Sequence, residues 1–179
     1  MQALSFIANF IGLSLVILAS LSKGSKMSTI LILVLFGNLF VSVGYLLAGT
    51  GINGAASGLL ATVQTFINYF FERKGKPVPK ILVGIYALSF IALNVFVSEF
   101  NFYSIIAILA CMLFLACILQ KNGKNFRICG ILNTLVWIIY DVLTHSYAAI
   151  MTHGMLLIVN IIGVIIHDIK RNETKNSAM

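Results

Sequence analysis

The stretch from Arg127 to His167 reads RICGILNTLVWIIYDVLTHSYAAIMTHGMLLIVNIIGVIIH. It holds two long apolar runs, 127–145 and 148–167. The short turn between them contains no Lys or Arg. A helix that crosses the hydrocarbon core of a bilayer needs about 20 mostly apolar residues. The stretch therefore predicts two antiparallel membrane helices.

The rest of the chain repeats this pattern. Of the 179 residues, 60% are hydrophobic and only 9% are charged, whereas an ordinary soluble domain has about 25% charged residues. So few charges cannot cover the surface of a soluble domain, which excludes a soluble enzyme, a disordered chain and a nucleic-acid-binding domain despite the net charge of +7. We expect an all-α integral membrane protein whose partner is the lipid bilayer, with seven transmembrane helices. The other five apolar runs lie at 4–21, 29–48, 53–71, 81–98 and 102–119.

The basic residues predict the orientation in the membrane. Lys and Arg in short loops stay on the cytoplasmic side, and with seven spans all 12 basic residues fall on one side. We therefore expect the amino terminus outside the cell and the carboxyl terminus in the cytosol. No basic residue precedes the first apolar run, so this run does not have the pattern of a cleaved signal peptide.

The chain also shows weak internal repetition. An offset of 95 residues aligns Asn38 with Asn133 and Tyr45 with Tyr140. A three-helix unit begins and ends on opposite sides of the membrane, so a second unit that followed it directly would be inverted. One extra helix between the units gives both the same orientation. Parallel repeats of this kind occur in SWEET transporters. We predict two parallel three-helix repeats joined by a linker helix. The expected divisions are a first repeat at 1–72, a basic loop and linker helix at 73–99, a second repeat at 100–168 and a cytosolic tail at 169–179.

Several segments resemble a known family. The segments CGILNTLVWIIYDVLTHSY (129–147) and MLLIVNIIG (155–163) resemble the last two helices of the YgjV family of bacterial inner-membrane proteins. The segments YLLAGTG (45–51) and LLATVQTFIN (59–68) are similar to the first half of that family. The resemblance covers nearly the whole chain and implies a multi-pass protein of the bacterial inner membrane.

A more distant similarity is to the SWEET and PQ-loop transporters, which share the predicted helix layout. This similarity implies that a Trp on the second helix and an Asn on the third helix of a repeat lie beside the substrate. Trp137 and Asn160 match these positions, and Ser42 and Thr65 are their counterparts in the first repeat. The chain differs from those transporters because its two prolines lie in the loop after the third span rather than within helices.

Polar residues within the spans form stripes along the predicted helices, as at Asn38, Ser42 and Tyr45, whose spacing of i, i+4 and i+7 places them on one face. A single such residue is better explained as a hydrogen bond between helices, worth about 0.6 kcal/mol. Stripes at similar depth in both repeats favour a central polar cavity, with Trp137 stacking on a substrate. The predicted substrate-binding residues are Trp137, Asn160, Asn133, Tyr140, Ser42, Thr65, Gln64, Asn38 and Tyr45.

Asp141 and His153 are predicted to form a pair near the outer mouth, because they lie at matched depth on adjacent antiparallel helices. An ionisable residue within a membrane is a functional candidate by default, so we expect an outer gate. The alternative is that both side chains lie shallow enough to reach the water at the headgroups.

The sequence favours transport over catalysis. It has no HExxH motif and no glycine-rich phosphate loop, and Cys111, Cys117 and Cys129 have no metal-ligand spacing. We expect no enzyme activity, no cofactor and no metal. The leading hypothesis is a facilitator that moves a small polar solute by alternating access, which requires a wet pocket. The alternative is a non-transporting scaffold or assembly partner with tightly packed helices and no cavity. Either function is compatible with a homo-oligomer.

Overall fold

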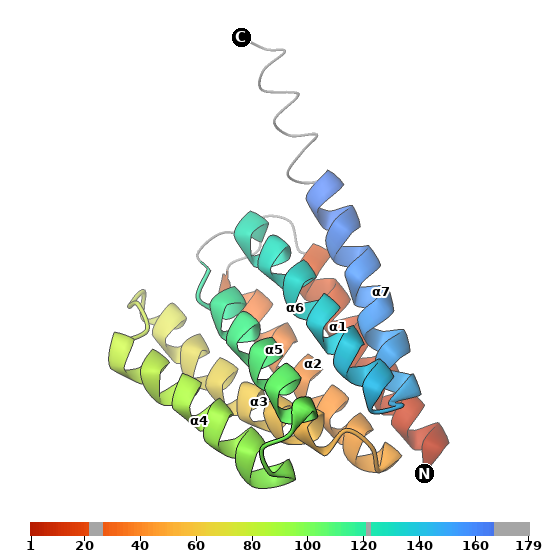
Figure 1. Cartoon of the computed structure of the whole chain (residues 1–179). Helices are drawn as coiled ribbons and strands as arrows, with labels where there is room; N and C mark the ends of the chain where they lie inside the picture. The colour runs from red at the N-terminus through yellow and green to blue at the C-terminus, as the bar shows by residue number, and fades with distance from the viewer. Residues whose placement is uncertain (22–26, 121–122, 167–179) are drawn as a thin grey trace.

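The computed structural model describes residues 1–21, 27–120 and 123–166, and this part of the chain folds into seven α-helices (Figure 1). The prediction of an all-α protein with seven helices is confirmed. The helices are α1 Gln2–Leu21, α2 Met27–Ala48, α3 Ile52–Arg73, α4 Lys80–Ser98, α5 Phe102–Ile118, α6 Gly123–Leu143 and α7 Tyr147–Val164. The predicted tail at 169–179 and the basic residues Lys23, Lys26, Lys121, Lys170, Arg171 and Lys175 lie outside the described residues.

Most of the helices suit a membrane. Five of those described, α1, α2, α4, α6 and α7, are long and apolar enough to cross a bilayer, and α5 is apolar but shorter, at 17 residues. The remaining helix, α3, carries buried polar residues along its length. These side chains are buried in the bundle, whereas apolar residues such as Val63 and Phe66 on another face of α3 are exposed. The buried polar residues are Asn53, Ser57, Gln64, Thr65 and Asn68.

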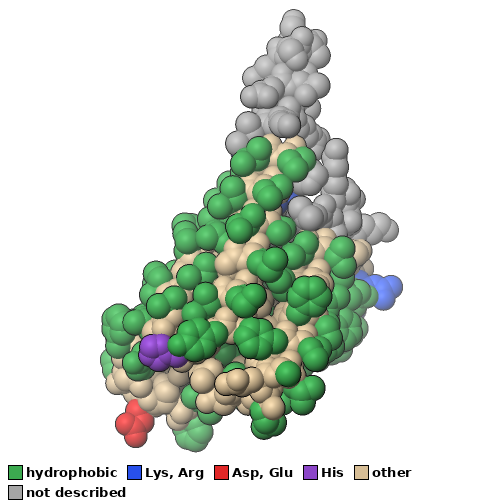
Figure 2. Space-filling view, turned by 90° about the vertical axis from the view of Figure 1, so that its right-hand side faces the viewer, with side chains coloured by type: hydrophobic (Ala, Val, Ile, Leu, Met, Phe, Trp, Pro, Cys, Tyr) green, Lys and Arg blue, Asp and Glu red, His purple; other side chains and the backbone are tan. Residues whose placement is uncertain are grey.

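The outer surface is apolar. Figure 2 shows hydrophobic side chains over most of one face of the molecule. Large hydrophobic residues such as Phe10, Leu88 and Phe96 are 66%, 69% and 88% exposed. Exposed apolar surface on this scale is unfavourable in water and is the expected surface of a protein in lipid.

The helices pack in a closed ring with one helix outside it. Each helix packs against the next in the chain, α7 returns to pack on α1, and α3 packs on α5. The linker helix α4 packs against α3 and α5. Under the offset of 95 residues α1 corresponds to α5 and α3 to α7, so the α1–α7 and α3–α5 contacts are equivalent. Two parallel three-helix units would give this pattern, although the exact divisions between them stay a prediction.

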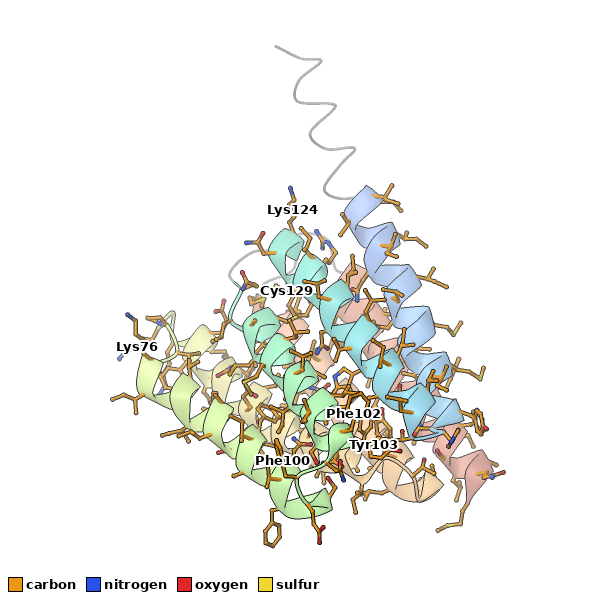
Figure 3. All side chains as sticks on the ribbon, in the orientation of Figure 1. Lys76, Phe100, Phe102, Tyr103, Lys124 and Cys129 are labelled. Atoms are coloured by element: carbon orange, nitrogen blue, oxygen red, sulfur yellow. The ribbon has the colours of Figure 1, made fainter. Side chains whose placement is uncertain are left out.

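The two ends of the bundle differ in composition. Lys76 and Lys124 lie at one end, and Phe100, Phe102 and Tyr103 lie at the opposite end (Figure 3). We call these the basic end and the aromatic end. The turn between α2 and α3 is at the aromatic end, because α3 ends at Arg73, near Lys76. The turn between α6 and α7 is also there, because α6 begins next to Lys124 at the basic end. The two basic positions that Figure 3 labels therefore share one end, as the predicted topology requires.

Small residues allow the first three helices to approach closely. A Cβ atom added at Gly12 would lie 2.8 Å from Val41 Cγ2 and 2.9 Å from the carbonyl oxygen of Gly37, so α1 and α2 touch along their backbones. A Cβ at Gly54 would lie 2.8 Å from the ring of Tyr45. Larger side chains at these positions would force the helices apart.

A buried polar network fixes the linker helix to α3. The Asn53 side chain donates from Nδ2 to both the backbone oxygen and Oδ1 of Asn94, at 3.0 Å each, and Asn94 Nδ2 donates to Ser57 Oγ at 2.9 Å. Asn94 is fully buried. Because buried polar groups are costly without partners, this network holds α4 in one position. The sequence analysis did not single out Asn53 or Asn94.

Candidate functional site

A cavity lies between the helices of the bundle. The space in it that the centres of water molecules can occupy is about 110 Å³. Every helix except α4 contributes to its wall. One water occupies about 30 Å³ of the liquid, so the cavity is large enough for several waters or a small solute. Six of the predicted binding and gate residues line it: Asn38, Tyr45, Asn133, Trp137, His153 and Asn160.

The polar side chains of the cavity come from both halves of the chain. Asn38 of α2 and Asn133 of α6 are counterparts at the offset of 95 residues, and both line the wall. The Asn133 amide donates to the carbonyl oxygen of Ala110 at 2.7 Å. Within the described chain, Asn38 Nδ2 and Asn160 Oδ1 are buried without hydrogen-bond partners. Because an unpartnered buried polar atom costs about 1–3 kcal/mol, a hydrogen-bond partner for either atom would stabilise this part of the bundle.

Trp137 forms a rigid aromatic wall. Its ring stacks nearly parallel to the imidazole of His153, with centroids 6.0 Å apart and an interplanar angle of 11°. The ring of Tyr140 meets Trp137 edge to face at 5.4 Å. Such aromatic contacts favour one orientation of the indole, so the face that Trp137 presents to the cavity is fixed by its neighbours.

The predicted contact between Asp141 and His153 is present in the structure, with His153 Nδ1 2.6 Å from Asp141 Oδ2. The hydroxyl of Tyr45 donates to the other carboxylate oxygen of Asp141. Asp141 is 0% exposed and His153 is 8% exposed. Both side chains are therefore buried among the helices, and their depth in the membrane stays a prediction. A buried carboxylate requires such partners because isolated burial of its charge is very unfavourable.

Two more hydrogen bonds join the halves at the aromatic end. The backbone N–H of Gly54 donates to the Tyr140 hydroxyl at 3.2 Å, and Ser146 Oγ donates to Thr50 Oγ1 at 3.1 Å. Towards the basic end, an apolar cluster also joins the halves. This cluster contains Ala19, Ile30, Val34, Cys117 and Phe126. Contacts between the halves therefore lie at both ends of the cavity.

Four predicted binding residues do not line the cavity. Ser42 Oγ donates to the carbonyl oxygen of Asn38 at 2.6 Å, and Thr65 Oγ1 donates to that of Ala61 at 2.7 Å. Gln64 is fully buried elsewhere in the bundle, with neither amide atom partnered among the described residues. Tyr140 supports Trp137 from the side. These four residues lie on the predicted helix faces. The rotation of each helix within the bundle, however, directs their side chains at neighbouring helices rather than into the cavity.

The sequence analysis missed two hydroxyl residues that line the cavity, Thr134 and Thr152. Each is adjacent in the chain to a predicted residue, Asn133 or His153. A search for single stripes overlooks such neighbours, since a cavity wall is wider than one row of side chains. In the part of the chain that the structure describes, no group of His, Cys, Asp and Glu could hold a metal ion.

Comparison with known proteins supports the membrane assignment. A family model described as a bacterial inner membrane protein, Imp-YgjV, matches residues 1–171. No curated protein and no solved structure matches the chain. The match confirms the predicted resemblance and the location in the inner membrane of a bacterium. The orientation of the termini and the similarity to SWEET and PQ-loop transporters stay predictions.

Proposed function

We propose that this chain, which belongs to the YgjV family of bacterial inner-membrane proteins, is a transporter that moves a small polar solute by alternating access. The observation that carries the proposal is the interior cavity with polar side chains from both halves. Asn38 and Asn160 line it, and Asn38 Nδ2 and Asn160 Oδ1 have no hydrogen-bond partner among the residues that the structure describes. Trp137 supplies a flat apolar surface on which part of a solute can stack.

The lining favours a solute without strong net charge. Its polar members are mainly amides and hydroxyls, and the imidazole of His153 is already paired with Asp141. A strongly charged solute would be buried without an opposite charge, which is very unfavourable. We therefore propose a neutral or zwitterionic molecule rich in hydrogen-bonding groups.

The hydrogen bonds at the aromatic end suggest how the cavity opens there. Opening at the aromatic end requires the loss of three hydrogen bonds between the halves: Tyr45–Asp141, Gly54–Tyr140 and Thr50–Ser146. Opening at the basic end would separate the apolar side chains around Val34 and Phe126. We propose that the two halves rock about the α1–α7 and α3–α5 contacts, and that the hydrogen-bonded end is the outer gate.

The cavity also bears on the alternative function. A scaffold or assembly partner needs tight seams between helices but no polar space inside the bundle, so the cavity favours transport. We further propose that the role is not catalytic, because the two oxygens of Asp141 are engaged by Tyr45 and His153 rather than by a nucleophile.

The test uses the single tryptophan of the chain. Because Trp137 lines the cavity, the intrinsic fluorescence of the purified protein reports on its occupancy. We expect a saturable change in emission with one class among sugars, polyols and zwitterionic amino acids. Asn160→Leu should remove this change, whereas Asn94→Leu, which lies outside the cavity, should retain it. No change with any class, together with no uptake of these compounds into proteoliposomes, would overturn the proposal.

A further inference from the structure

A second, larger groove opens at the basic end, with a volume of about 670 Å³. It lies between the starts of α2 and α4 and the ends of α3 and α5, and it shares no lining residue with the central cavity. Apolar residues, including Met27, Leu31 and Ile118, form part of its wall. Its polar lining consists of Asn68, Glu72, Lys76, Lys80 and Gln120. Figure 3 shows Lys76 at this end of the bundle.

The helix ends around the groove leave an excess of hydrogen-bond donors. The final carbonyls of α3 accept from the backbone amides of Lys74, Gly75 and Lys76. At the end of α5, Gln120 donates to two carbonyls, from its backbone and from its side chain. The start of α4, in contrast, has no side-chain cap at Pro79. The first amides of a helix have no partners within the helix and carry its positive dipole end, so the start of α4 favours an anion.

Asn68 adds a buried donor that has no protein partner. The residue is 2% exposed and lines the groove. Its Oδ1 accepts from the Tyr86 hydroxyl at 3.3 Å, whereas its Nδ2 has no hydrogen-bond partner within the described residues. An unsatisfied buried N–H group is unfavourable, and a ligand with acceptor oxygens would satisfy it.

The charged side chains of the groove also favour an anion, because their net charge is positive. Lys76 and Lys80 outnumber the single acid, Glu72, and between 27 and 120 no ion pair joins Glu72 to either lysine. We propose that this groove binds a phosphate group, with the two lysines supplying charge and Asn68 and the start of α4 supplying hydrogen bonds. The proposal does not depend on transport. The phosphate belongs either to the headgroup of an anionic phospholipid, whose chains would follow the apolar wall, or to a free phosphate.

The experiment compares these two sources on the purified full-length protein. Phosphatidylglycerol and phosphatidylcholine are titrated separately in detergent, and bound lipid is counted by native mass spectrometry. Inorganic phosphate is titrated against chloride at constant ionic strength, with thermal unfolding as the readout. The variant is Lys76→Gln/Lys80→Gln, and a second variant is Asn68→Leu. The matched control is Arg73→Gln/Lys74→Gln, which removes two charges near the groove from residues that do not line it.

We expect Lys76→Gln/Lys80→Gln to lower the affinity roughly 25-fold, at about fivefold for each lysine near an anionic lipid. Asn68→Leu should weaken binding with both lysines intact, and the control should lower the affinity less than Lys76→Gln/Lys80→Gln, because Arg73 and Lys74 do not line the groove. Binding of phosphatidylglycerol alone identifies the lipid headgroup, and binding of inorganic phosphate alone identifies a free phosphate. The proposal is overturned if neither binds, if phosphatidylcholine binds equally well, or if both double variants lose the same affinity. An unchanged Trp137 emission spectrum verifies that each variant is folded.

Discussion

The hydroxyl of Tyr45 donates a hydrogen bond to the carboxylate of Asp141, although the two residues are 96 positions apart in the chain. The other carboxylate oxygen lies 2.6 Å from His153 Nδ1. One fully buried carboxylate thus joins α2 in the first half to α6 and α7 in the second. Any motion that separates the halves at the aromatic end must break this contact.

Removal of the Tyr45 hydroxyl tests the contribution of this contact to the closed end. Tyr45→Phe should lower the stability by about 1.5–3 kcal/mol, the range for a hydrogen bond to a charged group. Tyr86→Phe is the matched control, because its hydroxyl donates to the neutral amide of Asn68 and should be worth only about 0.5–1.5 kcal/mol. Reversible unfolding in detergent measures both. Equal losses in the two variants would contradict a special role for the Tyr45–Asp141 bond.

A pH experiment tests whether Asp141 and His153 form a gate. Protonation of His153 turns its contact with Asp141 into an ion pair, and charge-assisted hydrogen bonds are stronger than neutral ones. Tyr45 and Tyr140 are the other titratable groups that the structure places beside this pair. We expect uptake of the solute found by fluorescence to fall as the pH on the side of the aromatic end falls.

The variant His153→Ala should abolish this pH dependence in a folded protein. His145→Asn is the control, because His145 is exposed in the turn at the same end, and Asn tolerates its positive φ of 53°. If His153→Ala only lowers the unfolding temperature and keeps the pH profile, the pair is structural and the gate hypothesis is wrong.

The two counterparts Thr65 and Asn160 should differ in their effect on binding. Asn160 lines the cavity, whereas Thr65 is buried and donates to Ala61. Thr65→Val keeps the shape of the side chain, so we expect the solute-dependent change in Trp137 emission to persist with an affinity close to that of wild type. A loss of the signal in Thr65→Val as large as that in Asn160→Leu would show that the solute binds outside the cavity described here.

The network around Asn94 should support stability without affecting binding. Asn94→Leu removes the side-chain partner of Asn53 Nδ2 and Ser57 Oγ on α4, while the bond from Asn53 Nδ2 to the backbone oxygen of residue 94 remains. Hydrogen bonds between membrane helices contribute about 0.6 kcal/mol on average and up to about 1.7 kcal/mol, so we expect a loss of roughly 1–3 kcal/mol. Thermal unfolding measures the loss, and the titration of Trp137 emission should be unchanged. A changed affinity would indicate that the linker helix is coupled to the cavity.

The proposed orientation is tested by fusions to alkaline phosphatase, which is active only outside the cytoplasm. Fusions after Gly51 and at Ser146 should be active, since both positions lie in turns at the aromatic end. Fusions near Lys76 and Lys124 should be inactive, because both residues lie at the basic end. Activity at Lys76 would reverse the orientation or change the number of spans before it.

The sequence by itself determined the helices and their order. Long apolar runs fix the number of helices because each span must satisfy its own backbone in lipid, and the structure has helices where the seven runs predicted them. The pairing of Asp141 with His153 could also be predicted, since a short turn between antiparallel helices brings residues at equal depth together.

The tertiary structure decided which polar residues share the cavity. Helical spacing places Asn38, Ser42 and Tyr45 on one side of α2, but it does not give the rotation of α2 against its neighbours. In the bundle, Asn38 and Tyr45 line the cavity, while Ser42 fills the space that Gly58 leaves on α3. The contact between Tyr45 and Asp141 likewise depends on how the two halves pack, because nothing local in the chain links residues 96 positions apart.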